Sequence, residues 1–118
     1  MPIATINPAT GETVKTFTPA TDQEVDAAIA RAYERFHDYR LNTTFAQRAQ
    51  WANATADLLE AEADEVAAMM TLEMGKTLKS AKAEAIKCAK GFRYYAENAE
   101  QLLADEHADA KAVGAKKA

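Results

Sequence analysis

The sequence has 118 residues, 48% of them apolar, which is enough for one small domain and not for two. Alanine supplies much of that fraction and buries little area per residue, so we expect a thin core whose helices pack against something else. The net charge of −4 and a pI near 5.2 argue against a general nucleic-acid binder, which shows a basic face.

The chain contains one cysteine, Cys88, and no basic, apolar leader near its start. A lone cysteine forms no internal disulfide, which is typical of a reducing compartment. No stretch approaches the length that spans a bilayer, and no repeat of fixed period is present. These features predict a cytoplasmic location.

The first predicted element is a β-hairpin. Apolar residues alternate in 3–6 and again in 13–18, and the intervening Asn7-Pro8-Ala9-Thr10-Gly11-Glu12 suits a tight reversal. An isolated two-stranded hairpin is marginal in water, so this one needs a helix or a larger sheet to join.

Two helices follow, and each begins with a capping box: Thr21 with Glu24, then Thr44 with Gln47. The first helix is predicted to fade near 39–42 and the second to end near Ala63. The apolar face of the first is Val25, Ile29, Ala32, Tyr33 and Phe36; that of the second is Ala49, Ala52, Ala56, Leu59 and Ala63.

A third helix is predicted from about Asp64 to Gly75, a residue suited to the left-handed position after a helix end. The fourth is predicted from about Thr77 to Leu103. Its apolar stripe is Leu78, Ala81, Ala85, Ala89, Phe92, Ala96, Ala99 and Leu103. Gly91 interrupts it, as glycine does where another backbone approaches closely.

The domain prediction is therefore a hairpin and four-helix unit over residues 1–103. The tail, 104–118, is rich in alanine and charge, and we expect it to fray or be disordered without partners.

Few residues have the pattern of a reactive site. Cys88 lies in mid-helix beside Lys87, and a small semi-buried helix residue is the favoured interpretation over a thiol nucleophile. His37 and His107 lack metal-ligand spacing and are predicted to be surface residues.

Other clusters also favour structural interpretations. The acidic pairs are expected to be a solvated face and a helix start: Glu60 with Glu62, and Asp64 with Glu65. The methionines Met69, Met70 and Met74 are expected to fill a core. Glycine never occurs as G-x-G, so no glycine-rich phosphate loop is present.

Short motifs, in this order and spacing, resemble the aldehyde dehydrogenase superfamily. The run from Asn7 to Glu12 is similar to its opening hairpin, and Thr71-Leu72-Glu73-Met74-Gly75-Lys76-Thr77 to a signature at the end of its third N-terminal helix. Arg48 and Trp51, and Gly91-Phe92-Arg93-Tyr94-Tyr95-Ala96-Glu97, also fit. The resemblance covers about residues 1–110 and looks closest to bacterial succinate-semialdehyde dehydrogenases that use NADP or NAD.

The resemblance implies a fold and a reaction. The fold would be the N-terminal part of the α/β aldehyde dehydrogenase fold, belonging to its Rossmann-like cofactor domain. The reaction would be NAD(P)⁺-dependent oxidation of an aldehyde to a carboxylate by a cysteine and a glutamate. In such enzymes these residues, and the cofactor turn, lie beyond position 118. Cys88 does not match the nucleophile's motif, so an inactive fragment that binds no cofactor alone is expected, with the missing domains as its partners.

The same resemblance places Ala83 and Lys87 on the helix face that borders the substrate entrance. Lys87 would then attract a carboxylate-bearing aldehyde, although an ordinary solvated lysine is the favoured interpretation. Two other functions stay open: a small helical interaction module that binds full-length dehydrogenase or another protein, and an autonomous structural bundle. An interaction module would use exposed apolar faces as interfaces.

Overall fold

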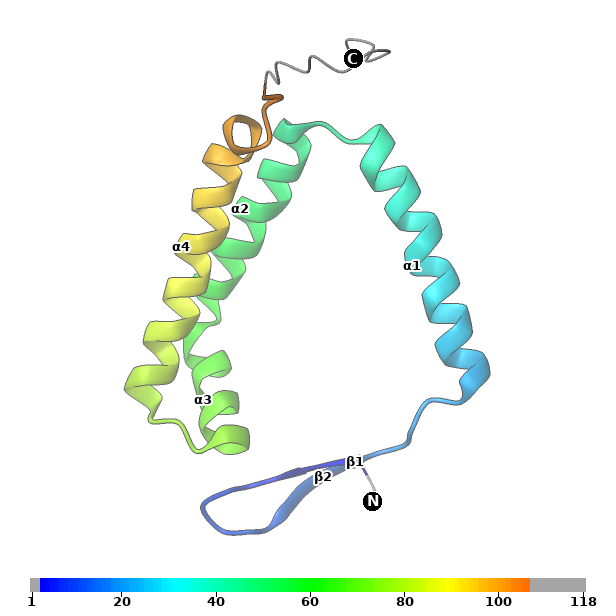
Figure 1. The fold of residues 1–118 in the computed structure, drawn as a ribbon. Coiled ribbons are helices and arrows are strands. Elements are labelled where there is room, and N and C mark those ends of the chain that lie inside the picture. Colours follow the sequence, from blue (N-terminus) through cyan, green and yellow to red (C-terminus); the bar gives the residue numbers. More distant parts are fainter. Residues whose placement is uncertain (1–2, 107–118) are drawn as a thin grey trace.

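The computed structural model describes residues 3–106 and has six elements (Figure 1). These are β1 (Ile3–Ile6), β2 (Thr13–Phe17), α1 (Asp22–Asn42), α2 (Phe45–Ala61), α3 (Ala63–Met74) and α4 (Leu78–Leu102). The predicted fold class, mainly helical with an N-terminal hairpin, is confirmed. The prediction for the tail lies largely outside the described residues and stays a prediction.

The hairpin turns where the sequence predicted. β1 and β2 pair antiparallel, with Ile3 opposite Phe17. The carbonyl of Asn7 accepts a hydrogen bond from the Gly11 amide at 2.8 Å, and the Asn7 side chain accepts one from the Ala9 amide at 2.9 Å. Gly11 has a φ of 75°, a conformation that glycine adopts without steric cost. Local turn chemistry alone therefore closes the hairpin.

Both predicted capping boxes are present. The Thr21 hydroxyl accepts from the Glu24 amide at 3.3 Å, and the Glu24 carboxylate accepts from the Thr21 amide at 2.8 Å. Thr44 and Gln47 make the same reciprocal pair at the start of α2. These bonds fix where α1 and α2 begin, because they satisfy amides that have no partner within the helix.

The packed part of the molecule is α2, α3 and α4. Helices α2 and α3 follow one another with a break at Glu62, and α4 runs back beside both (Figure 1). Among residues 3–106 the buried residues are all alanines: Ala56, Ala63, Ala67, Ala81, Ala85 and Ala89. Small side chains let the helices approach closely but bury little apolar area, so the predicted thin core is confirmed.

Ion pairs hold the edges of this unit. The Arg93 guanidinium on α4 donates to Asp57 at 2.8 Å and to Glu60 at 2.6 Å, both on α2. Lys82 donates to Asp64 on α3 at 2.6 Å. These side chains are at least one-third exposed, Arg93 the least at 34%. Ion pairs in contact with water orient the helices more than they stabilise them.

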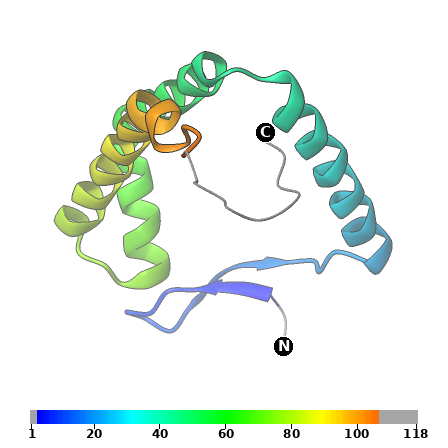
Figure 2. The ribbon, with the colours of Figure 1, turned by 45° about the horizontal axis from the view of Figure 1, so that its top comes forward.

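Helix α1 lies apart from α2–α4 along most of its length and meets α2 near its C-terminal end (Figures 1 and 2). It has no buried residue, and its predicted apolar face is open: Ile29 is 62% and Tyr33 65% exposed. The radius of gyration is 21.0 Å, whereas a compact domain of this length has about 13 Å. The expectation that these helices pack against something outside the described residues is therefore supported by the shape of the chain.

Two expectations about individual side chains are wrong. Met69 and Met74 are 62% and 78% exposed and fill no core, because alanines occupy the contact between α3 and α4. Cys88 is exposed rather than semi-buried, because neighbouring Ala85 and Ala89 take the inward positions. At Gly91 a Cβ would meet no atom within 4 Å among residues 3–106, so the close approach of another backbone stays a prediction.

Candidate functional site

The hairpin motif and the signature at the end of α3, more than 60 residues apart in the sequence, meet in space. The Thr5 hydroxyl on β1 donates to the Glu73 carboxylate near the end of α3 at 3.1 Å. A Cβ built at Gly75 would lie 3.2 Å from Pro8 Cγ, so the hairpin turn rests against the end of α3. Gly75 has a φ of 68°, which also disfavours any side chain there. The hairpin and signature motifs thus form one joint, which sequence spacing did not predict.

Arg48 joins α1 to α2. Its guanidinium donates to the Thr43 hydroxyl at 2.7 Å and to the main-chain carbonyl of Tyr39 at 3.2 Å. It also lies 4.5 Å from the centre of the Tyr39 ring. A cation at the C-terminus of a helix satisfies carbonyls that have no amide partner there. Arg48 therefore sets the corner at which α1 leaves the packed unit.

The motif Gly91–Glu97 in α4 contributes a contact between helices through Arg93. Arg93 within it donates to two acidic groups of α2, and hydrogen bonds from Glu60 first and Asp57 second raise the pKa of its guanidinium. Glu60, predicted to belong to a solvated face, is exposed and takes part in this pair. Asp64 and Glu65 lie in the first turn of α3, as predicted.

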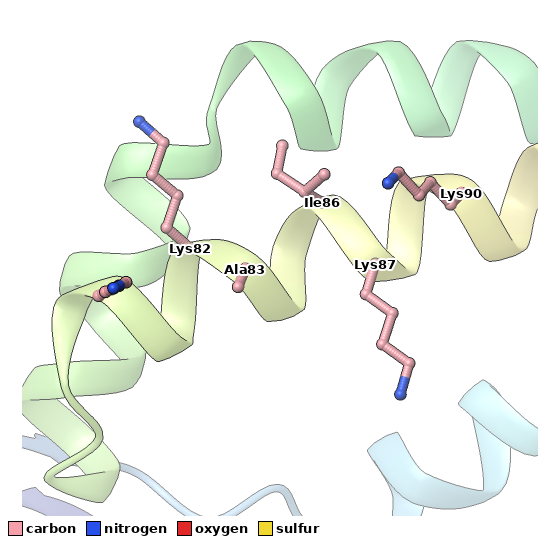
Figure 3. A pocket seen from close by; sticks show the side chains of 6 residues that line it. Lys82, Ala83, Ile86, Lys87 and Lys90 are labelled. Carbon is pink, nitrogen blue, oxygen red and sulfur yellow. The ribbon is translucent and has the colours of Figure 1, made fainter.

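The structure places the two candidate entrance residues on an exposed side of α4. Ala83 and Lys87 line an open hollow together with Lys79, Lys82, Ile86 and Lys90 (Figure 3). Lys87 points away from Lys82, which reaches toward α3 (Figure 3). Sequence reasoning singled out Lys87 and missed the other lysines. The available signal was that Lys79 and Lys82, and likewise Lys87 and Lys90, are three residues apart, because residues at that spacing lie side by side on a helix.

The remaining candidate residues are not brought together. His37 is half-buried rather than fully exposed, and its ring lies 4.5 Å from that of Tyr33. His107 lies outside the described residues. Within residues 3–106, no three His, Cys, Asp or Glu side chains are arranged to hold a metal ion. No helix in that range is long and apolar enough to cross a membrane.

A dinucleotide does not fit the described residues. Gly75 precedes α4 but is followed by Lys76, which pairs with Glu84 instead of facing an open cradle. Gly11 lies in the hairpin turn and Gly91 within α4, so no cluster of glycines brackets a helix N-terminus between residues 3 and 106. The backbone cradle that pyrophosphate requires is therefore not formed by these residues.

The chain belongs to the aldehyde dehydrogenase family, because residues 1–117 match the model of that family. It is 90% identical over its whole length to a succinate-semialdehyde dehydrogenase [NADP⁺] of Mycobacterium avium. It is 84% identical, over 98% of its length, to succinate-semialdehyde dehydrogenase [NADP⁺] 1 of Mycobacterium tuberculosis. The resemblance given by the motifs is confirmed. In both comparisons the chain spans 25% of the relative's length.

Solved structures share the same arrangement. Succinic semialdehyde dehydrogenase from Streptococcus pyogenes, crystallised with NADP⁺, matches 92% of this chain with a TM-score of 0.85 and 29% identity. HpcC from Thermus thermophilus matches 94% of it with a TM-score of 0.81 and 30% identity. The chain covers 24% and 21% of those proteins. The open arrangement of α1 and α2–α4 is therefore also found within chains about four times longer.

Proposed function

We propose that this chain is the N-terminal quarter of an NADP-dependent succinate-semialdehyde dehydrogenase, forming the outer wrapping of its nucleotide-binding domain. The parent reaction would be oxidation of the aldehyde to the carboxylate, in the cytoplasm. The cofactor would supply the hydride acceptor, and the residues that hold it would lie outside this chain.

One observation carries the proposal. The chain keeps its open shape, with α1 held away from α2–α4, at a TM-score of 0.85 against part of a much longer chain. All nine aromatic side chains are exposed here, which a self-contained domain avoids. Their natural covering is the remaining three quarters of the polypeptide. The 90% identity to a curated relative supports the substrate and the cofactor.

The main role of the chain would be structural: it would position α1 and the hairpin for packing against the rest of the enzyme. Arg48 sets the direction of α1, and the joint between Pro8 and Gly75 sets the position of the hairpin. Together these two contacts would position the apolar faces of α1 and of the hairpin so that they can pack against strands of the larger domain. Ala83 and Lys87 would border the substrate entrance; their exposure on α4 and the absence of an ion pair on Lys87 among residues 3–106 support this.

The test is a hybrid dehydrogenase: the Mycobacterium avium relative with its matching quarter replaced by this chain. We expect the hybrid to oxidise succinate semialdehyde with NADP⁺, and the isolated 118 residues to show no turnover. A hybrid that is soluble and folded but inactive would contradict the proposal. Turnover by the isolated chain that is lost in Cys88→Ser would contradict it as well, because it would place the nucleophile here.

A further inference from the structure

The outer side of α4 carries a concentration of positive charge that the fold does not use. The hollow there is lined by four lysines, Ala83 and Ile86 (Figure 3). The buried side of the same helix is formed by Ala81, Ala85 and Ala89, which pack against α2 and α3. The four lysines and Ala83 are exposed, whereas Ile86 is half-buried. We call this set, Lys79, Lys82, Ala83, Ile86, Lys87 and Lys90, the lysine face.

Most of the charge on the lysine face is unbalanced. Lys82 pairs with Asp64 at 2.6 Å. Lys79, Lys87 and Lys90 have no ion pair with any residue in 3–106. Between positions 79 and 90 there are four lysines and one glutamate, in a chain whose net charge is −4. Like charges on one helix face repel one another, and an anion placed among them relieves that repulsion.

The geometry points to a small carboxylate as the ligand. An ammonium group is a compact charge with three donors, which suits one carboxylate oxygen at a time. Ala83 and Ile86 lie between the lysines and offer an apolar surface for a short methylene chain. Lys79 and Lys90 are about 16 Å apart along the helix, so a ligand of a few carbons over Ala83 and Ile86 would lie between them and interact with each ammonium group across solvent.

We propose that the lysine face binds the carboxylate of the semialdehyde substrate and of its diacid product, with Lys79 and Lys90 acting together with Lys87. This rests on the proposed function and extends it to two residues that sequence reasoning did not select. Because the face is open to solvent, the binding is weak and depends on salt, and falls off over a Debye length of about 8 Å at physiological ionic strength.

The first experiment compares aldehydes in the hybrid dehydrogenase. In Lys79→Gln/Lys90→Gln we expect KM for succinate semialdehyde to rise roughly threefold at low salt, the scale of two solvated charge interactions. We expect kcat, and KM for the uncharged aldehyde butanal, to stay unchanged, and the difference to disappear in high salt. Lys15→Gln, which removes a charge from the hairpin, is the matched control and should change nothing.

The result that overturns the proposal is equal change with both aldehydes, or an effect no larger than that of Lys15→Gln. If the unmodified hybrid does not oxidise succinate semialdehyde, the proposed function fails and a second measurement decides the lysine face. That measurement is a titration of the 118-residue chain with succinate, followed by amide NMR shifts and compared with sodium chloride of equal ionic strength. Saturable shifts on α4 that are lost in the double variant support the site. Shifts that chloride reproduces, or no shifts at all, refute it.

Discussion

Pro8 and Gly75 touch across the molecule: a Cβ at Gly75 would lie 3.2 Å from Pro8 Cγ. The two residues belong to separate motifs, one in the hairpin turn and one at the end of α3. Gly75 also caps α3 in a left-handed conformation, with its amide donating to the Thr71 carbonyl at 3.0 Å. One glycine thus ends a helix and admits a proline from elsewhere in the chain.

Replacing this glycine should therefore be costly. We expect Gly75→Ala to lower the free energy of unfolding by about 1–2 kcal/mol, from the left-handed backbone together with the contact to Pro8. Gly91→Ala is the matched control: it lies within α4 with open space around it, and should stabilise by about 0.5–1 kcal/mol. Urea unfolding of the hybrid dehydrogenase, followed by circular dichroism, measures both. Equal effects of the two changes would show that the contact has no energetic role.

Arg48 should be irreplaceable by a smaller cation. In Arg48→Lys the ammonium keeps the charge but loses the fork that reaches Thr43 and the Tyr39 carbonyl together. We expect a loss of about 1–2 kcal/mol, the scale of hydrogen bonds to a charged group in a part-buried site. Arg40→Lys, on the exposed end of α1, should stay within about 0.5 kcal/mol. The same urea experiment separates the two, and a similar response to both would argue against the corner role.

The start of α1 should be sensitive to acid. Hydrogen bonds from the Thr21 amide, and then from its hydroxyl, lower the pKa of the Glu24 carboxyl. A group whose pKa is lower in the folded chain stabilises it above its ordinary value, and that contribution is lost as the pH falls through the folded pKa. Helix content near α1 should therefore fall as the solution becomes more acidic than about pH 4.5. In Glu24→Gln this component of the acid transition should be missing; an unchanged titration would contradict it.

Lys87 gives the direct test of the entrance proposal. In the hybrid dehydrogenase, Lys87→Ala should raise KM for succinate semialdehyde much more than KM for butanal, because only the first carries a carboxylate. Lys15→Gln, which removes one charge from the hairpin and none from α4, serves as the control. Equal changes in both KM values after Lys87→Ala would end the idea.

The isolated chain should be helical but melt over a broad range. Its accessible area is 10192 Å², whereas a folded protein of this mass exposes about 6300 Å². The chain therefore buries less surface on folding than a compact protein of its mass, and we expect its unfolding to be weakly cooperative. A circular-dichroism melt checks this. A sharp transition, together with co-purification of full-length dehydrogenase, would favour the alternative of a self-standing interaction module.

The sequence by itself determined where the elements begin and end. Thr21 with Glu24 and Thr44 with Gln47 start helices, and Gly75 ends one, through bonds among neighbouring residues. Capping bonds of this kind join residues three or four positions apart, so a short stretch of sequence is enough to predict them. The family motifs could be recognised in the sequence for the same reason, because each lies within a single turn or around one helix.

Only the tertiary structure decided which faces are covered. Ala81, Ala85 and Ala89 are buried while Tyr33, Met69 and Cys88 are not, although all lie in helices with apolar residues on one side. Burial depends on what lies across from a side chain, and helical periodicity does not contain that information. For the same reason the contact of Pro8 with Gly75 and the corner made by Arg48 appeared only once the chain was folded, since each joins elements whose relative placement no local pattern sets.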